Sequence, residues 1–368
     1  MSRTPYIVVA SLLKHDAMCA LFFSHLESRA PLRIVQYGRD SLAAPLAGAS
    51  ALVVIRGLFE FGNLIGCARQ LRIPCYYFLD DNFMLIREES KRYGTSYARY
   101  TDENVRHALT GFSGVLLAAE TLIDYFRERQ LHPHPVYYPP TAGPTLGLPE
   151  AERRPLTVAF FGGAHRRGPF ARYVYPALRR LASSHPIRIV AAGIDRAELA
   201  NTSGIEVLAF PYDPSYERAL QAVASVGVDI LVHPSDDSSN NIFKNPHVLI
   251  NARAIGATPI FSDAAPYQHA EAAGIALIAG DSDEAWFRAL HALASDPQRR
   301  AAIHARLTEY CDQHFDGARN LAVLGEILRS HPLPAWPPAA ARFVMASACL
   351  TVGRFQRKMS SLVAPATA

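Results

Sequence analysis

Short apolar runs rich in β-branched and aromatic residues alternate along the chain with segments of helical length. In the first half we place predicted strands at Tyr6–Ala10, Leu32–Gln36, Ala51–Ile55, Cys75–Leu79, Gly114–Ala118 and Pro135–Tyr138. Helices are predicted between them at Ala17–Glu27, Phe61–Leu71, Glu103–Thr110 and Thr121–Arg129. Strands that alternate with helices in this way indicate a parallel sheet wound through β-α-β units.

A second series of the same kind follows. Its strands are predicted at Thr157–Phe161, Ile187–Ala192, Glu206–Leu208, Ile230–His233, Pro259–Ser262 and Ala276–Ala279. Its helices are predicted at Phe170–Ser184, Tyr216–Val226, Pro246–Ile255, Asp283–Ala294 and Gln298–Cys311. Since one core stops growing at roughly 250–300 residues, a chain of 368 residues is expected to form two domains. We therefore predict an α/β fold of two doubly wound, Rossmann-like domains that face a cleft.

Proline and glycine mark the boundary between the two series. Six residues, Pro139–Pro144, include three prolines and a glycine, a density that continues neither a helix nor a central strand. We expect an N-terminal domain at 1–140, a linker at 141–155, a second domain at 156–331 and a tail at 332–368.

The tail begins with a second proline-rich stretch, Pro332–Pro338, and continues into a predicted helix, Ala339–Leu362. Three cations, Arg354, Arg357 and Lys358, lie near the end of that helix. Two interpretations stay open: the helix packs back across the domains, which we favour, or it lies on an anionic lipid surface. No apolar run reaches the roughly 18–20 residues of a membrane-spanning helix.

Composition excludes two classes of protein. With 49% hydrophobic and 19% charged residues, the chain is unlike a disordered one. Its 37 Lys and Arg against 33 Asp and Glu leave a net charge of +4, too small to mark a dedicated nucleic-acid binder. Five scattered cysteines and the lack of a signal-peptide pattern favour a cytoplasmic protein, with the inner face of the membrane as a further option.

The loop after the predicted strand Thr157–Phe161 is a candidate anion site. Gly162 and Gly163 allow a close backbone approach, and Arg166 and Arg167 add forked donors that suit phosphate. Neither a dinucleotide fingerprint nor a P-loop is present. An ordinary tight turn between strand and helix is the alternative.

A second candidate spans 229–263, which contains a strand, a polar loop, a helix and another strand. Lys244 lies just before the predicted helix Pro246–Ile255, where the helix dipole disfavours a cation unless an anion is also bound. This placement indicates a phosphate partner. The alternative is that the polar run from Ser235 to Asn241 is merely a solvated loop.

This stretch resembles the nucleotide-sugar-binding segment of GT-B glycosyltransferases that build bacterial surface polysaccharides. The matching residues are Pro234, Lys244, Gly256, Pro259, Ser262, Asp263 and the run Ala265–Tyr267. The likeness extends to Gly162 and Gly163 as the phosphate loop and to Phe210–Tyr212 at the end of the nucleobase loop. It implies that the donor is contacted by Gly162, Gly163, Arg166, Arg167, Tyr212, Asn241, Lys244 and Asn251.

The chain departs from the resembled pattern at two positions. Asn251 stands where the family usually carries a ribose-binding Glu, and Phe243 stands where retaining members carry another Glu. An amide oxygen still accepts a hydrogen bond, but without the charge that strengthens it. If Asn251 faces the ribose, Asn251→Glu is expected to bind the donor at least as well.

Candidate catalytic residues follow predicted strands of the first domain. Asp80 and Asp81 match an acidic strand-end motif of the same enzymes, and they could orient or deprotonate an acceptor hydroxyl, cap the next helix or pair with Arg87. His15 lies where inverting GT-B enzymes carry their base, while Asp16 could simply cap the next helix.

The resemblance implies a metal-independent glycosyltransferase without a cofactor. It would move a sugar from a nucleotide-diphosphate donor to a glycan or lipid-linked acceptor in surface polysaccharide or glycoconjugate synthesis. It would bind no nucleic acid, and peripheral contact with the membrane stays open. Three alternatives remain: a catalytically weakened GT-B-like binding module, a GT-B sugar-nucleotide epimerase, and a metal-dependent GT-A transferase that uses Asp80 and Asp81 on a single nucleotide-binding domain.

Overall fold

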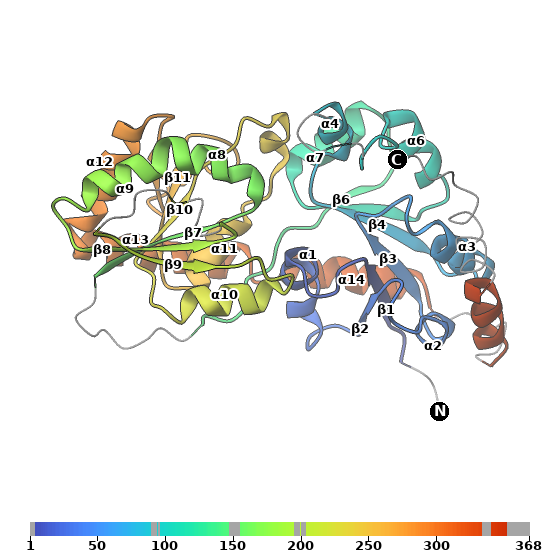
Figure 1. The fold of residues 1–368 in the computed structure, drawn as a ribbon. Helices are drawn as coiled ribbons and strands as arrows, with labels where there is room; N and C mark the ends of the chain where they lie inside the picture. Colours follow the sequence, from blue (N-terminus) through green and yellow to red (C-terminus); the bar gives the residue numbers. More distant parts are fainter. Residues whose placement is uncertain are drawn as a thin grey trace, which may run out of the picture. The chain divides into compact units, whose positions relative to one another are not determined.

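The computed structural model describes residues 4–89, 94, 96–146, 155–194, 199, 204–332 and 340–351. The chain divides into two compact units (Figure 1). Unit 1 consists of Met1–Lys14, Phe22–Pro139 and Ala318–Ala368, and unit 2 consists of His15–Leu21 and Pro140–Gly317. The chain therefore crosses between the units more often than a single linker would require.

Unit 1 contains a six-stranded parallel sheet with the strand order β2-β1-β3-β4-β5-β6. The strands are β1 Ile7–Ser11, β2 Leu32–Gln36, β3 Ala51–Ile55, β4 Cys75–Leu79, β5 Gly114–Leu117 and β6 Pro135–Tyr137. Every residue of β1, β3, β4 and β5 is buried, as expected of strands covered on both faces. The apolar runs of the sequence are the direct cause of this sheet.

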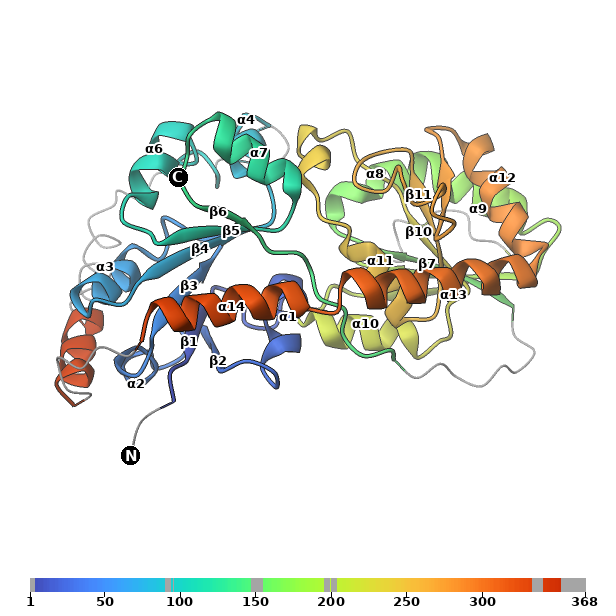
Figure 2. The same ribbon diagram turned by 180° about the vertical axis from the view of Figure 1, so that it is seen from behind.

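The helices of unit 1 are short. They are α2 Ala43–Ala47, α3 Gly62–Gln70, α4 Phe83–Glu88, α6 Asp102–Leu109, α7 Glu120–Glu128 and α14 Ala318–Ser330. Helix α1 Ala17–Phe22 is grouped with unit 2 except for its last residue. A 3₁₀ turn, Ser24–Leu26, follows α1, and residues 340–351 form a further helix. Figure 2 shows α14 running along the sheet, where buried Asn320 donates to the Pro139 carbonyl at 2.8 Å.

Unit 2 repeats the architecture, with the strand order β12-β11-β10-β7-β8-β9 and parallel pairing throughout. Its strands are β7 Leu156–Phe161, β8 Ile187–Ala192, β9 Glu206–Phe210, β10 Ile230–His233, β11 Thr258–Ser262 and β12 Leu277–Ala279. The core gathers apolar side chains of these strands with the fully buried Trp286. Because β7 and β10 are neighbours, the loops that follow them leave the sheet at the same edge.

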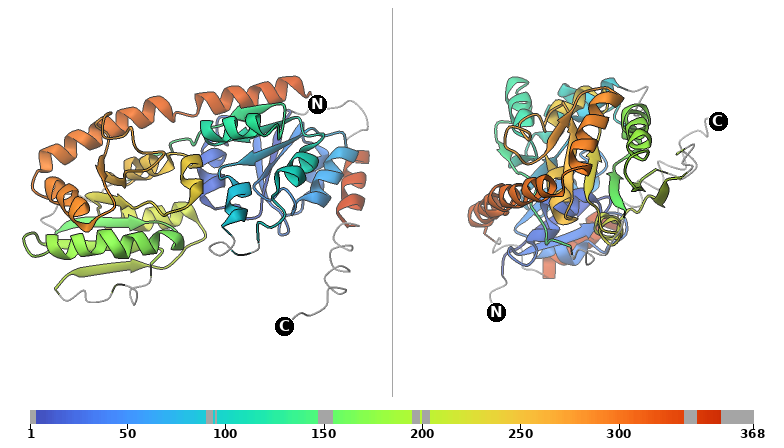
Figure 3. Two further views of the ribbon diagram at one scale, coloured as in Figure 1. Left: turned by 90° about the horizontal axis from the view of Figure 1, so that it is seen from above. Right: turned by 90° about the vertical axis from the view of Figure 1, so that its left-hand side faces the viewer.

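Helical elements of unit 2 surround this sheet. They are the 3₁₀ turns Ala164–Arg166 and Ser239–Phe243, α8 Arg167–Pro169, a π-helical turn Phe170–Val174, α9 Tyr175–Leu181, α10 Tyr216–Ala224, α11 His247–Ala254, α12 Asp283–Ala294 and α13 Pro297–His314. Figure 3 shows α9 beside α12, which it packs against. Side chains of Ser215, Ser282 and Asp296 accept backbone hydrogen bonds at helix starts, so polar residues define where α10, α12 and α13 begin.

The predicted fold class is confirmed, and each of the twelve predicted strands is present. Among the helices in the described residues, α2, α4, α8 and α14 were not predicted. The expected end of the second domain at 331 differs from the observed grouping, because Gly317, with φ of +80°, separates α13 from α14 and α14 packs in unit 1. Residues 147–154 of the expected linker and the cations Arg354, Arg357 and Lys358 lie outside the described residues.

Within the described residues, no helix has both the length and the hydropathy that crossing a membrane requires.

Candidate functional site

Two loops meet at the carboxyl edge of the sheet in unit 2. The loop after β7 carries His165 and Arg166, and the loop after β10 carries Pro234 and Asp236. Buried Arg166 donates through Nη1 to the Pro234 carbonyl at 3.0 Å. The ring of His165 lies 3.8 Å from the carboxylate of Asp236, measured from Nε2 to Oδ2. The sequence placed Arg166 here, but His165 and Asp236 were missed.

The backbone of the glycine loop is packed closely. At Gly193, after β8, φ is +88° and an added Cβ would lie 2.4 Å from the Gly162 carbonyl oxygen, so only glycine fits. Arg167 donates from Nε and Nη2 to the Gly193 carbonyl at 3.1 and 2.9 Å. At Gly163 an added Cβ would meet the His165 ring at 2.9 Å. The two predicted arginines therefore each use part of their donor set on backbone carbonyls.

A buried histidine lies at the centre of the basic groups. His233, the last residue of β10, is 3% exposed, and its ring lies edge-on to Phe261 and Tyr267 at 6.1 and 5.6 Å between centroids. Burial holds the pKa of His233 well below its ordinary value. Nearby basic groups lower this pKa further; they are Arg166, His247, His165 and Lys244. Two cations, Arg166 and Lys244, thus lie near the end of β10, which suits an anion, and the carboxylate of Asp236 lies beside them.

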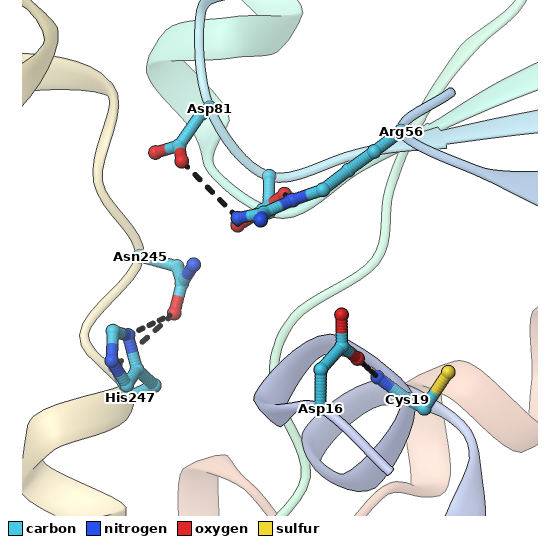
Figure 4. Close-up of polar contacts among 7 residues, drawn as sticks. Asp16, Cys19, Arg56, Asp81, Asn245 and His247 are labelled. Atoms are coloured by element: carbon cyan, nitrogen blue, oxygen red, sulfur yellow. Dashed lines mark hydrogen bonds and ion pairs between the residues drawn. The ribbon is translucent and has the colours of Figure 1, made fainter. Parts of the chain in front are cut away.

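Lys244 and the start of α11 belong to this region. Lys244 ends the 3₁₀ turn Ser239–Phe243, and its backbone N–H donates to the Asn241 carbonyl at 3.1 Å. The side chain of buried Asn245 accepts from the His247 backbone N–H at 3.2 Å and contacts the His247 ring nitrogen Nδ1 at 3.0 Å (Figure 4). Asn245 therefore orients the first residue of α11, a role that the Asn-Pro-His sequence could have suggested.

The other predicted donor residues differ in their surroundings. Tyr212 is 76% exposed on the segment between β9 and α10. The side chain of Asn241 donates to the Asp236 carbonyl within its own loop. Asn251 is buried, and its side-chain oxygen accepts from the Tyr216 hydroxyl at 2.5 Å. The side-chain oxygen of Asn251, which was expected to face a ribose, is therefore already hydrogen-bonded to a residue of α10.

Asp80 and Asp81 of unit 1 pair with a residue that the sequence did not indicate. Arg56, directly after β3, donates to both carboxylate oxygens of Asp80 at 2.5 Å and to Asp81 Oδ2 at 3.2 Å, and Figure 4 shows the Asp81 contact. The expected partner, Arg87, lies instead 3.4 Å from Glu88. Of the interpretations left open for Asp80 and Asp81, the recorded ion pair is thus with Arg56, and the residue that caps α4 is Asn82.

The backbone of Arg56 adopts a left-handed conformation, with φ of +60°. Its carbonyl accepts from the hydroxyls of Tyr77 at 2.7 Å and Tyr100 at 2.9 Å. Burial raises the pKa of both hydroxyls, so they remain donors at neutral pH. Such strain in a residue with a side chain costs on the order of 1–2 kcal/mol and persists where surrounding contacts fix it. The position of the Arg56 guanidinium is therefore specified by the fold.

The third predicted catalytic residue belongs to unit 2. The backbone carbonyl of His15 accepts from the Tyr216 N–H at 2.8 Å. The side chain of Asp16 accepts from the Cys19 N–H at 2.9 Å (Figure 4). The interpretation of Asp16 as a helix cap is confirmed, since α1 begins at Ala17. The role of His15 as a base stays a prediction.

Comparison with known proteins was made by sequence and by structure. No protein-family model and no curated protein matches the sequence. The fold is similar to sucrose-phosphate synthase from Thermosynechococcus elongatus, with a TM-score of 0.58, 12% identity, and coverage of 89% of this chain and 99% of that one. For HepE from Anabaena in complex with UDP-glucose, the TM-score is 0.56, the identity 14% and the coverage 88% and 99%. For WaaG, a glycosyltransferase involved in lipopolysaccharide biosynthesis, the values are 0.54, 12%, 87% and 99%.

Identities this low establish the fold. The chain has the GT-B fold of these structures, with two parallel α/β domains, and the resemblance seen in the sequence is confirmed at this level. The alternative of a single-domain GT-A transferase is wrong, because two complete six-stranded sheets are present.

Proposed function

We propose that the chain is a glycosyltransferase whose unit 2 binds a nucleotide-diphosphate sugar at the carboxyl edge of its sheet, between the loops after β7 and β10. The observation that carries the proposal is that the loops after β7 and β10 bring Arg166 and Lys244 near buried His233 at the end of β10. Such a concentration of positive charge stabilises a diphosphate. The GT-B fold supports the choice of a sugar nucleotide among diphosphates.

Lys244 would be the principal anchor of the diphosphate. It precedes α11, and the start of a helix favours an anion, although the His247 N–H there already donates to Asn245. Arg166 and Arg167 would add fixed charge through the N–H groups not used on Pro234 and Gly193, since each guanidinium has five donors. Gly162 and Gly163 would let the backbone approach the phosphates. These groups would neutralise the leaving diphosphate without a metal or a cofactor.

Unit 1 would hold the acceptor, a glycan or a lipid-linked sugar. Asp80 and Asp81 would orient its hydroxyl groups, with Asp80 kept in place by the bidentate contact to Arg56. His15 is the proposed base. Synthesis of surface polysaccharide or another glycoconjugate fits such an acceptor, and a lipid-linked one would bring the enzyme to a membrane surface.

One observation favours a second candidate, a binding module with weakened catalysis. The oxygen of Asn251 is bound to Tyr216, and an uncharged residue stands where the resembled enzymes carry Glu. A module would bind the sugar nucleotide tightly without transferring or hydrolysing the sugar. An epimerase would convert the donor without any acceptor, so the products of donor alone separate the three cases.

A thermal-shift screen of nucleoside diphosphates and their sugars tests the proposal. UDP-glucose is the first compound to try, because HepE was solved in complex with it. A ligand at 100 times its dissociation constant should add about 2.7 kcal/mol to the free energy of unfolding. Stabilisation by one nucleobase series supports the proposal. If neither the diphosphates nor their sugars raise the melting temperature, the proposed donor site is wrong.

A further inference from the structure

A buried carboxylate lies inside the region proposed to bind the donor diphosphate. Asp236 belongs to the same loop as Pro234, whose carbonyl accepts from Arg166, and the Asp236 side chain is 3% exposed. One of its carboxylate oxygens, Oδ1, accepts from the Ser238 backbone N–H at 3.2 Å. A negative charge among groups that bind a diphosphate repels it, so the site favours the donor only when this charge is balanced.

The ring of His165 lies where it can balance this charge. Its Nε2 is 3.8 Å from the other carboxylate oxygen, Oδ2, and among the described residues His165 is the cation that pairs with Asp236. The ring also packs on Gly163, where an added Cβ would lie 2.9 Å from the ring carbon Cε1. Since an ionised carboxylate is costly to bury without a partner, Asp236 favours the protonated, positive form of the ring.

His165 differs from the other basic groups of this region. Its side chain is 33% exposed, and a histidine gains or loses its proton near neutral pH, whereas arginine and lysine stay charged. Burial holds the pKa of His233 well below its ordinary value, so that ring stays neutral. The other charged or titratable groups, which adjoin the pair in sequence or lie near His233, are Arg166, Arg167, Asp237, Lys244 and His247.

We propose that the His165–Asp236 pair makes binding of the donor dependent on pH. With the ring protonated, the pair has no net charge, and the diphosphate meets the positive charge of Arg166 and Lys244. Once the ring loses its proton, the carboxylate of Asp236 is unbalanced and opposes the diphosphate. The proton on His165 and the donor therefore strengthen each other's binding, and affinity is highest below neutral pH. This inference rests on the proposed donor site and adds the regulation of that site.

Calorimetric titration with UDP-glucose at pH 6 and pH 8 tests the pair; a different sugar nucleotide replaces it if the thermal screen selects one. Each phosphate of a nucleotide-diphosphate sugar has one strongly acidic group, so the ligand has the same phosphate charge at both pH values. The parent should bind roughly tenfold more weakly at pH 8, because one unbalanced charge near a phosphate is worth about that factor at an effective dielectric constant of about 20. His165→Gln should bind equally at both pH values, at the weaker level of the parent.

Asp236→Asn gives a result that a merely structural role of the carboxylate would not. The amide oxygen of the new side chain can still accept from the Ser238 N–H, so the loop is kept while the charge is removed. This variant should bind UDP-glucose roughly tenfold more tightly than the parent does at pH 8. The matched control is Asp237→Asn, which removes an exposed carboxylate from the same loop and should bind as the parent does.

The outcomes separate this proposal from the donor site on which it rests. Equal affinity of the parent at pH 6 and pH 8 would overturn the proposal and leave the donor site intact. A pH dependence that persists in His165→Gln would also overturn it, because His247 or another group would then be responsible. So would weaker binding by Asp236→Asn at pH 8, which would show that the carboxylate assists the donor. If the parent binds no sugar nucleotide of the screen at either pH, the donor site itself is wrong.

Discussion

Arg56→Gln removes the cation that joins Asp80 and Asp81 while keeping a side chain on the strained backbone position. Deleting one partner of a buried ion pair costs about 3–5 kcal/mol. The Arg56 side chain is 35% exposed whereas that of Asp80 is 3% exposed, so solvent screens part of the interaction. We therefore expect a loss of about 2 kcal/mol in the free energy of unfolding.

Chemical denaturation followed by circular dichroism measures this loss. Arg87→Gln is the matched control, because the Arg87 side chain is equally exposed and its partner Glu88 is 61% exposed; it should cost less than about 0.5 kcal/mol. Equal effects of the two substitutions at neutral pH would refute the claim that Arg56 organises the acidic cluster.

Three further predictions concern other parts of the fold. Because the folded state lowers the pKa of His233, the unfolded chain takes up a proton there first as pH falls, and the free energy of unfolding should decline below about pH 6.5 by up to about 1.4 kcal/mol per pH unit. His233→Phe should flatten this slope in denaturation experiments at pH 7 and pH 5. An unchanged slope would show that the ring is solvated in the folded chain. Asn251→Glu should destabilise unit 2 by about 1–3 kcal/mol, since it places a buried carboxylate beside the Tyr216 hydroxyl. Calorimetry that shows tighter donor binding without this loss of stability would contradict the observed contact. Diamide should react first with Cys349, the one free cysteine that is not fully buried, and the adduct should then form a disulfide with Cys67. The second step should be slow at neutral pH, because burial and the neighbouring Cys349 raise the pKa of the Cys67 thiol to about 12. Peptide mapping should find Cys19, Cys75 and Cys311 still reduced, and a different pairing would show that the helix at 340–351 is not held on α3.

The sheets could be predicted from the sequence because buried strands are the strongest apolar signals in it. Strands β2, β3, β4, β8 and β10 have the predicted bounds. The missed helices carry weaker signals. Helix α2 is five residues long and contains Pro45, and α4 begins at the Asn82 cap, beside carboxylates that were interpreted as chemistry. Helix α14 begins shortly after the end of α13, and no strand separates the two helices, so the alternation of strands and helices did not indicate it.

Side-chain partners were harder to predict than elements. Local sequence offered Arg87 to Asp80 and Asp81, but Arg56 reaches them from the end of a neighbouring strand, 24 residues from Asp80. Asn251 likewise meets Tyr216 across a separation of 35 residues. Asp16 was predictable as a cap because its partner, Cys19, is three residues away. Contacts set by chain topology therefore escaped the sequence, whereas contacts within a turn were predictable in principle, although the Asn82 cap and the Asn245–His247 contact were missed.

The central claim is that the basic region at the end of β10 binds the donor diphosphate, and calorimetric titration of Lys244→Ala tests it most directly. A charged hydrogen bond to phosphate is worth about 1.5–3 kcal/mol, so the variant should bind the best nucleoside diphosphate of the screen roughly ten- to a hundredfold more weakly. Arg288→Ala, which removes an exposed cation from α12 in the same unit, should leave the affinity unchanged. Lys244→Ala that binds the diphosphate as tightly as the parent would contradict the account.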